Sequence, residues 1–225
     1  MEIALFSKFG QVASKTLAIL ALLFLAACSP QVLPTTASQP TGAPATAQIA
    51  QQTATMPIQT TPLATNCTNP MPLTPALTEG PYFKAGSPER ASLLESGVSG
   101  QKLVLSGYVL TPDCKPIAHA LLDFWQADTS GHYDNMGSTL RGHQFSDAQG
   151  YYRLETIIPG LYPGRTEHIH VKLQALNGPV LTTQLFFPGV ASNDQDSIYD
   201  PKMVIAIQDT QDGDIGMFNF VLSVP

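Results

Sequence analysis

Charged side chains are scarce in this chain, and the basic ones are the scarcer kind. Of its 225 residues, 11 are Lys or Arg and 17 are Asp or Glu, which gives a net charge of −6. No basic patch is visible along the sequence, so a nucleic acid is not expected as a partner, because proteins that bind nucleic acids present clustered Lys and Arg to the phosphates. A charge content of 12% suits a β-rich secreted domain with many turns.

Long helical patterns and internal repeats are also missing. No segment carries apolar residues at helical spacing for more than about two turns. From Lys102 onward, short apolar runs alternate with turn residues, and we expect strands at 103–110, 119–126, 151–156, 168–175, 180–187, 204–208 and 217–224. About seven short strands at this spacing predict an all-β fold, a β-sandwich of two mixed or antiparallel sheets. We expect its functional site on loops and strand ends.

An apolar run near the N-terminus is too short for a typical transmembrane helix, which needs about 20 residues. It spans residues 17–25 and follows Lys8 and Lys15, the order of charge and apolar residues found in a secretory signal. Leu25-Ala26-Ala27-Cys28-Ser29 comes next, and small residues before a Cys resemble a bacterial lipobox. Residues 1–27 are therefore expected to be a signal peptide and Cys28 the lipidated first residue. A plain signal peptide cut after an Ala-x-Ala-like site, or a membrane anchor, is the alternative.

Residues 29–66 are rich in Thr, Ala, Pro and Gln and show neither charge nor apolar periodicity. Such a segment cannot bury enough apolar surface to offset the entropy of ordering. Residues 28–66 are therefore expected to form a lipidated, disordered tether. The folded domain is expected at residues 67–225.

Cys67 and Cys114 are the only cysteines besides Cys28. In an oxidising compartment, two leftover cysteines are expected to form a disulfide. The bridge would fasten the start of the folded domain to the turn after the first expected strand. Two unpaired thiols are the alternative.

Four residues near the middle of the chain suggest a metal site: Tyr133, Tyr162, His168 and His170. Residues i and i+2 of a strand point to one face, so both histidines can reach one metal while Ile169 points into the core. Imidazole suits several transition metals. Phenolate is a hard anionic donor, which narrows the choice towards ferric iron. On these residues alone, core or rim tyrosines and an ordinary His-x-His pair remain the alternative.

The surrounding sequence resembles the intradiol ring-cleavage dioxygenases, the family of the catechol 1,2- and protocatechuate 3,4-dioxygenases. The resemblance runs from about Leu73 to about Pro188, with all four candidate ligands in place. It is carried, in the family's order, by Thr78-Glu79-Gly80-Pro81-Tyr82-Phe83, Leu105-Ser106-Gly107-Tyr108-Val109, Leu122-Asp123-Phe124-Trp125-Gln126-Ala127-Asp128, Gly131-His132-Tyr133, Arg141-Gly142, Ser146-Asp147-Ala148-Gln149-Gly150, Thr156-Ile157-Ile158-Pro159-Gly160 and Arg165-Thr166-Glu167-His168-Ile169-His170-Val171. The family implies the same β-sandwich fold.

The resemblance also implies an iron-dependent reaction and assigns roles to residues. One Fe(III) per chain would be bound by the two tyrosines and two histidines, and Tyr162 would be the ligand that leaves when substrate binds. Arg165 matches the family arginine that stabilises charge on the reacting ring, and Gln184 matches the glutamine near the substrate oxygens. Gly80, Pro81 and Tyr82 match the family segment that lines the mouth of the site. The implied reaction uses O2 to cleave a catechol ring between its two oxygens and gives a cis,cis-muconate-type diacid.

The substrate and two other functions stay open. The helical N-terminal domain of catechol 1,2-dioxygenases and the second subunit type of protocatechuate enzymes have no counterpart in this sequence. We therefore favour catechol or a simple substituted catechol as the small aromatic diol. One alternative function is an envelope-tethered, transthyretin-like β-sandwich that binds a partner without catalysis. The other is an iron–catecholate binder without turnover.

The lipobox predicts that the protein is anchored by its lipid in the bacterial cell envelope. Ser29 follows the lipidated cysteine, where an Asp would signal retention in the inner membrane, so the outer membrane is favoured, facing the periplasm or the cell surface. Several acyl chains on one cysteine hold a protein firmly, whereas a single chain binds only marginally.

Replacing Cys28 by Ser should therefore release the protein from the membrane fraction, with its signal uncleaved or cleaved elsewhere. Cell fractionation and the mass of the N-terminal peptide measure both effects. A chain shortened to begin at about Asn66 should stay soluble and keep its metal, because neither tether nor anchor supplies a ligand. Metal loss in that shortened chain would contradict the predicted domain boundary.

Overall fold

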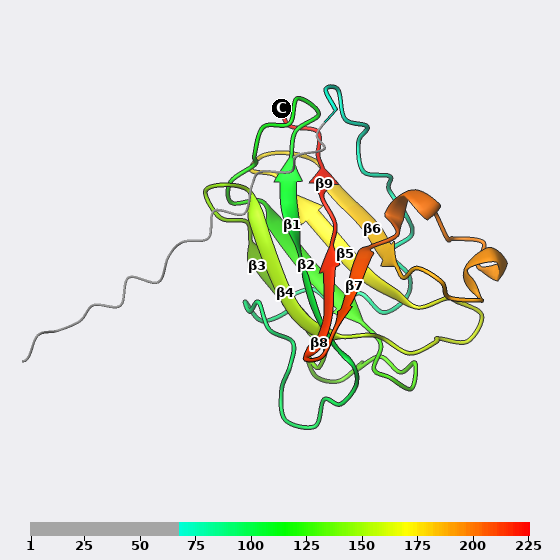
Figure 1. The fold of residues 1–225 in the computed structure, drawn as a ribbon. Helices are drawn as coiled ribbons and strands as arrows, with labels where there is room; N and C mark the ends of the chain where they lie inside the picture. The colour runs from blue at the N-terminus through cyan, green and yellow to red at the C-terminus, as the bar shows by residue number, and fades with distance from the viewer. Residues whose placement is uncertain (1–67) are drawn as a thin grey trace, which may run out of the picture. The chain divides into compact units, whose positions relative to one another are not determined.

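The computed structural model describes residues 68–225, which form two β-sheets (Figure 1). In chain order the strands are β1 (Lys102–Leu110), β2 (Leu121–Gln126), β3 (Arg141–Phe145), β4 (Tyr151–Ile157), β5 (His168–Gln174), β6 (Val180–Phe186), β7 (Ala206–Thr210), β8 (Gly213–Met217) and β9 (Phe220–Val221). Two short 3₁₀ helices, η1 (Asn193–Gln195) and η2 (Pro201–Met203), are the helical elements of this described part.

One sheet is mixed and the other is antiparallel. In the mixed sheet the order is β4-β1-β8-β7, and β1 pairs antiparallel with β4 but parallel with β8 and β9. The second sheet has the order β3-β2-β5-β6, with every neighbouring pair antiparallel. The predicted all-β sandwich of two mixed or antiparallel sheets is confirmed.

Alternating apolar residues of the strands form the core between the sheets. In β5, Ile169, Val171 and Leu173 are fully buried in this core. Burial of one such side chain contributes about 1.5–3 kcal/mol. A shift of the β5 register by one residue would turn all three out of this core, so the core fixes which β5 residues face the opposite side.

The segment before β1 covers the edges of three strands. The Leu77 N–H donates to a carbonyl of β6 at 2.9 Å, the Arg90 N–H to one of β3 at 2.8 Å and the Leu93 N–H to one of β4 at 2.8 Å. At these positions the edge groups are not free to pair with another chain. The same segment carries residues 80–83 across the outer face of the second sheet, where the site lies.

The sequence pattern fails to predict two strands, β3 and β8. Their sequences, Arg-Gly-His-Gln-Phe and Gly-Asp-Ile-Gly-Met, lack apolar alternation. Each forms because a neighbour supplies hydrogen-bond partners: β3 pairs along β2, and β8 lies between β1 and β7. The expected strand 217–224 is divided, since Met217 ends β8 and Phe220–Val221 forms the separate short strand β9; both pair in parallel with β1.

The predicted signal peptide 1–27, Cys28, the tether to residue 66, and Cys67 lie outside the described residues. Cys114 is disulfide-bonded, and residues 68–225 contain no second cysteine. Its pairing with Cys67 therefore stays a prediction. Within 68–225, no helix has the length and apolar character needed to span a membrane.

Candidate metal centre

His168 and His170 begin β5 and share one face of the second sheet. Ile169 between them is buried in the core, so both imidazoles turn to the opposite, outer face. Their Nε2 atoms are 3.1 Å apart, and only 4% of His168 and 2% of His170 is exposed. This spacing fits two neighbouring ligands of one ion, because metals such as zinc bind imidazole nitrogen at about 2.0–2.1 Å.

The backbone sets the protonation of His168. Its Nδ1–H donates to the carbonyl oxygen of Thr166 at 2.6 Å, so Nε2 carries the lone pair. Metal-binding histidines commonly use the second ring nitrogen in this way. Burial lowers the pKa of His168 to about 4 and holds the pKa of His170 well below its usual value. Both imidazoles are therefore neutral at neutral pH, as metal binding requires.

Tyr133 reaches the histidines from the loop after β2. Its hydroxyl lies 3.1 Å from Nε2 of His168. The carboxylate of Asp128 accepts the N–H groups of Ser130 at 2.8 Å and His132 at 3.0 Å. Such a turn fixes the backbone just before Tyr133.

The protein alone disfavours the phenolate form of Tyr133. Burial raises its pKa well above the ordinary value, although the positive charges of Arg165 and Arg141 act in the opposite direction. Coordination by a phenolate therefore depends on a strongly acidic cation at the centre, which stabilises the deprotonated oxygen. This donor chemistry fits Fe(III).

Tyr162 lies on the loop between β4 and β5, which packs against the Tyr133 loop. A Cβ atom on Gly131 would stand 2.1 Å from the carbonyl oxygen of Leu161, and one on Gly160 would stand 2.2 Å from a backbone oxygen of the Tyr133 loop. Only glycine permits this approach. The Tyr133 and Tyr162 ring centroids are 6.1 Å apart as a result.

The hydroxyl of Tyr162 hydrogen-bonds the hydroxyl of Tyr82 at 2.9 Å. Tyr82 also stacks on Tyr133, with centroids 4.4 Å apart and an interplanar angle of 13°. The structure therefore places the Tyr133 hydroxyl and the nitrogens of His168 and His170 in contact. The fourth predicted ligand stands beside them, paired with Tyr82.

Aromatic rings shield the cluster of Tyr133, His168 and His170 on the outer face of the sheet. Trp125 of β2 stacks on His170, with centroids 4.8 Å apart and an interplanar angle of 6°. Gly80 lies against the same imidazole, since a Cβ on it would be 3.4 Å from His170 Cε1. Of the three residues predicted at the mouth, Gly80 and Tyr82 contact the cluster, whereas Pro81 between them is exposed.

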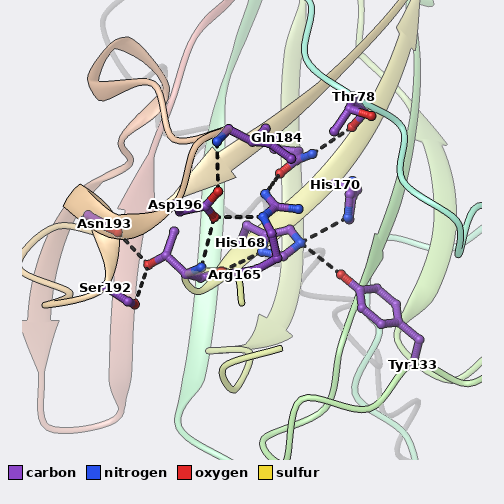
Figure 2. Close-up of polar contacts among 11 residues, drawn as sticks. Thr78, Tyr133, Arg165, His168, His170, Gln184, Ser192, Asn193 and Asp196 are labelled. Atoms are coloured by element: carbon purple, nitrogen blue, oxygen red, sulfur yellow. Dashed lines mark hydrogen bonds and ion pairs between the residues drawn. The ribbon is translucent and has the colours of Figure 1, made fainter. Parts of the chain in front are cut away.

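Arg165 and Gln184 meet beside the histidines (Figure 2). Gln184 is the cross-strand neighbour of His170 on β6. Its Oε1 accepts a hydrogen bond from Nη2 of Arg165 at 2.6 Å, and its Nε2 donates to the carbonyl of Thr78 at 2.7 Å. The Nε of Arg165 donates to Asp196 at 2.8 Å.

A cavity of about 400 Å³ lies beside Tyr162 and Arg165. Its walls include Tyr162, Arg165, Leu161, Gln195 and Asp196. The volume lies in the range of small-molecule pockets, roughly 300–1,000 Å³. A compact ligand in it would contact both Tyr162 and Arg165.

Sequence reasoning missed Trp125 and Asp196 as parts of the site. The available sequence signal for Trp125 was its position in the motif 122–128, whereas its register opposite His170 is a property of the folded sheet. Asp196 gave no sequence signal. His132 has an 80% exposed side chain and His143 donates to the Ser87 carbonyl, so neither joins the cluster. Residues 68–225 contain no group of three or more His, Cys, Asp or Glu suited to a metal. A metal here therefore needs the tyrosines.

Comparisons with known proteins identify relatives of this chain. A family model described as "Dioxygenase" matches residues 78–224. The chain is 30% identical to catechol 1,2-dioxygenase of Acinetobacter baylyi, over 52% of this chain and 47% of that protein. It is 36% identical to the protocatechuate 3,4-dioxygenase beta chain of Burkholderia cepacia, over 40% and 46%. The chain thus spans about half the length of these curated relatives.

A solved structure is more similar. It is the dioxygenase domain of a dioxygenase–carbohydrate-binding protein fusion from the cellulolytic bacterium Streptomyces sp. SirexAA-E. The identity is 53% and the TM-score 0.67, over 68% of this chain and all of that domain.

Replacing His170 by Ala should remove one converging nitrogen and weaken iron binding by more than about 10–100-fold, the scale seen for losing an outer-shell partner alone. The visible absorption of iron-bound tyrosinate should disappear with the metal. Iron content and the visible spectrum measure the effect. His132→Ala, at an exposed histidine, is the control and should keep both. Full iron and colour in His170→Ala would refute the assignment.

Proposed function

We propose that this chain, which belongs to the intradiol ring-cleavage dioxygenase family, is a non-haem Fe(III) enzyme that opens the ring of catechol-type diols between their two oxygens. The observation that carries the proposal is the meeting of the Tyr133 hydroxyl and the two Nε2 atoms of His168 and His170 at 3.1 Å. Tyr162 completes the set from the adjoining loop. A module that only binds a partner has no need of this donor set.

The four side chains would hold one ferric ion, which supplies Lewis acidity that polarises the bound diol and keeps phenolic oxygens deprotonated. The chain's own residues prepare the site for it. His168 presents a lone pair fixed by the Thr166 carbonyl. Trp125 and Tyr82 keep bulk water away from the buried donors, which strengthens every electrostatic interaction between them.

Tyr162 can accept a proton from the diol, and Tyr82 hydrogen-bonds the hydroxyl that results. A catechol that binds as a dianion must lose two protons: the oxygen of Tyr162 can take one, and the other passes to solvent. The resulting hydroxyl stays held by the Tyr82 oxygen, 2.9 Å away. The hydrogen bond with Tyr162, and then burial, raise the pKa of Tyr82. Tyr82 therefore remains a neutral phenol able to hydrogen-bond its neighbour.

Arg165 would stabilise the negative charge that develops on the substrate as the ring loses its aromaticity. Its guanidinium is fixed by Gln184 and Asp196 before substrate arrives, so little reorganisation is needed during the reaction. Loss of one preorganised donor of this kind costs roughly 2.7–4 kcal/mol in other enzymes.

The proposed substrates are catechol or simple substituted catechols, and the co-substrate is O2. Both oxygen atoms enter the product, and the carbon–carbon bond between the two oxygen-bearing carbons breaks. Catechol plus O2 then balances to cis,cis-muconic acid without an external reductant. We further propose that the enzyme is held on the outer membrane through a lipid on Cys28.

The proposal is tested by oxygen uptake with the iron-loaded protein. Catechol should consume O2 in a one-to-one ratio and yield cis,cis-muconate, identified by mass spectrometry. A coloured protein that binds catechol but consumes no O2 would be a non-catalytic binder. A colourless, iron-free protein from iron-supplemented cells would favour a binding module instead.

Replacing Arg165 by Ala should lower kcat about 10²–10³-fold, because a preorganised charge stabiliser is lost. Iron content should stay unchanged, since Arg165 is not a ligand. The matched control is Arg153→Ala, which removes an exposed arginine paired with Glu155. Oxygen-uptake kinetics separate the two variants. A wild-type kcat in Arg165→Ala would leave that arginine a purely structural role.

A further inference from the structure

We propose that Asp196 is a positioning residue: its buried carboxylate fixes the guanidinium of Arg165 relative to the metal ligand His168. The kinetic consequence rests on the proposed function. The anchoring itself rests on hydrogen bonds that join the residues just before β5 to the loop around η1, from Arg165 and Thr166 to Asp196 and from Thr166 to Asn193, as Figure 2 shows.

Two of the three guanidinium nitrogens of Arg165 have protein acceptors on separate elements. Nε donates to Oδ2 of Asp196 at 2.8 Å, and Nη2 donates to Oε1 of Gln184 at 2.6 Å. Among residues 68–225 the structure gives Nη1 no hydrogen-bond acceptor, and Arg165 lines the cavity beside Tyr162. Two acceptors on different elements fix the plane of the guanidinium. Nη1 is then the nitrogen left for a ligand.

The carboxylate of Asp196 is built into the fold. Only 1% of its side chain is exposed. Its Oδ2 also accepts the N–H of Thr166 at 2.9 Å, and its Oδ1 accepts the N–H of Ile198 at 2.9 Å. Desolvation acts to raise the pKa of Asp196, but these hydrogen bonds and the charge of Arg165 outweigh it and lower the pKa. The group is therefore an ionised, immobile acceptor.

Thr166 connects this carboxylate to the metal ligand. Its N–H donates to Asp196, and its carbonyl accepts Nδ1–H of His168 at 2.6 Å. Its hydroxyl donates to Oδ1 of Asn193 at 2.6 Å, which holds the residue from a third side. Arg165 is thus bonded to the Asp196 carboxylate, and His168 is bonded to Thr166, which is bonded to the same carboxylate. The distance between the charge stabiliser and the centre cannot drift without breaking these bonds.

Such anchoring matters because electrostatic stabilisation depends on preorganisation. A displacement of about 1 Å can cost on the order of 10²-fold in rate. An exposed ion pair has no comparable effect, since solvent screens it. The contrast between this buried pair and the exposed Arg153–Glu155 pair can be measured in the same chain.

A double-mutant cycle tests the coupling in the iron-loaded protein. Asp196→Ala should lower kcat by about 10–100-fold while iron content and anaerobic catechol affinity stay close to wild type. The double variant Arg165→Ala/Asp196→Ala should be no slower than Arg165→Ala, because Asp196 acts through Arg165. Glu155→Ala is the matched control and should keep the wild-type kcat.

Two kinetic outcomes would overturn the proposal. If the losses multiply in the double variant, Asp196 acts independently of Arg165. If iron content falls in parallel with kcat, its role is structural. Should Asp196→Ala fail to fold, the same cycle is run with Asp196→Asn, which keeps the side-chain size and one acceptor oxygen, for one of the two backbone N–H groups, and removes the charge.

A readout without activity separates this inference from the proposed function. In the metal-free full chain, the Arg165 Nε–H should exchange slowly with water in nitrogen-15 NMR spectra, and Asp196→Asn should speed that exchange. Unchanged exchange would refute the anchoring whatever the activity. Faster exchange in a protein that consumes no O2 would refute the proposed reaction and leave the anchoring standing.

Discussion

The site depends on the two-sided burial of β5. Ile169, Val171 and Leu173 face the core, so His168 and His170 must point to the opposite face of the sheet. Register and face are inseparable in a strand, so the apolar residues that stabilise the sandwich also aim both imidazoles at one point. A site on a central strand is more rigid than one built on loops alone.

The second requirement is a cover for the outer face of that strand. The Tyr133 and Tyr162 loops meet through Gly131 and Gly160, where a Cβ atom would collide with backbone. The segment before β1 then brings Tyr82 across both rings. These contacts bury two histidines and a phenol that would otherwise be hydrated. Burial keeps both imidazoles unprotonated but keeps the Tyr133 phenol protonated, so binding through that oxygen requires a cation acidic enough to displace the phenol proton.

Charge near the centre is confined to groups held at fixed positions. Arg141 is buried and donates to the carbonyl of Tyr82 at 2.7 Å. Arg165 is held by Asp196 and Gln184. Both arginines act on the Tyr133 phenol in the direction of its deprotonated form. The proposed metal ligands and the proposed charge stabiliser are therefore held by one connected set of hydrogen bonds and packing contacts.

The sequence by itself determined the all-β fold, the alternation of β5 and the placing of the His-x-His pair on one face, because these follow from local period and apolar pattern. It also marked both tyrosines, through motifs that resemble a known family. Only the tertiary structure decided that β3 forms a strand and that Asp196 holds Arg165, 31 residues before it in the chain. Those features arise from pairing and packing between segments distant in sequence. A local sequence pattern carries no information about which distant carboxylate or backbone segment will lie next to a given residue.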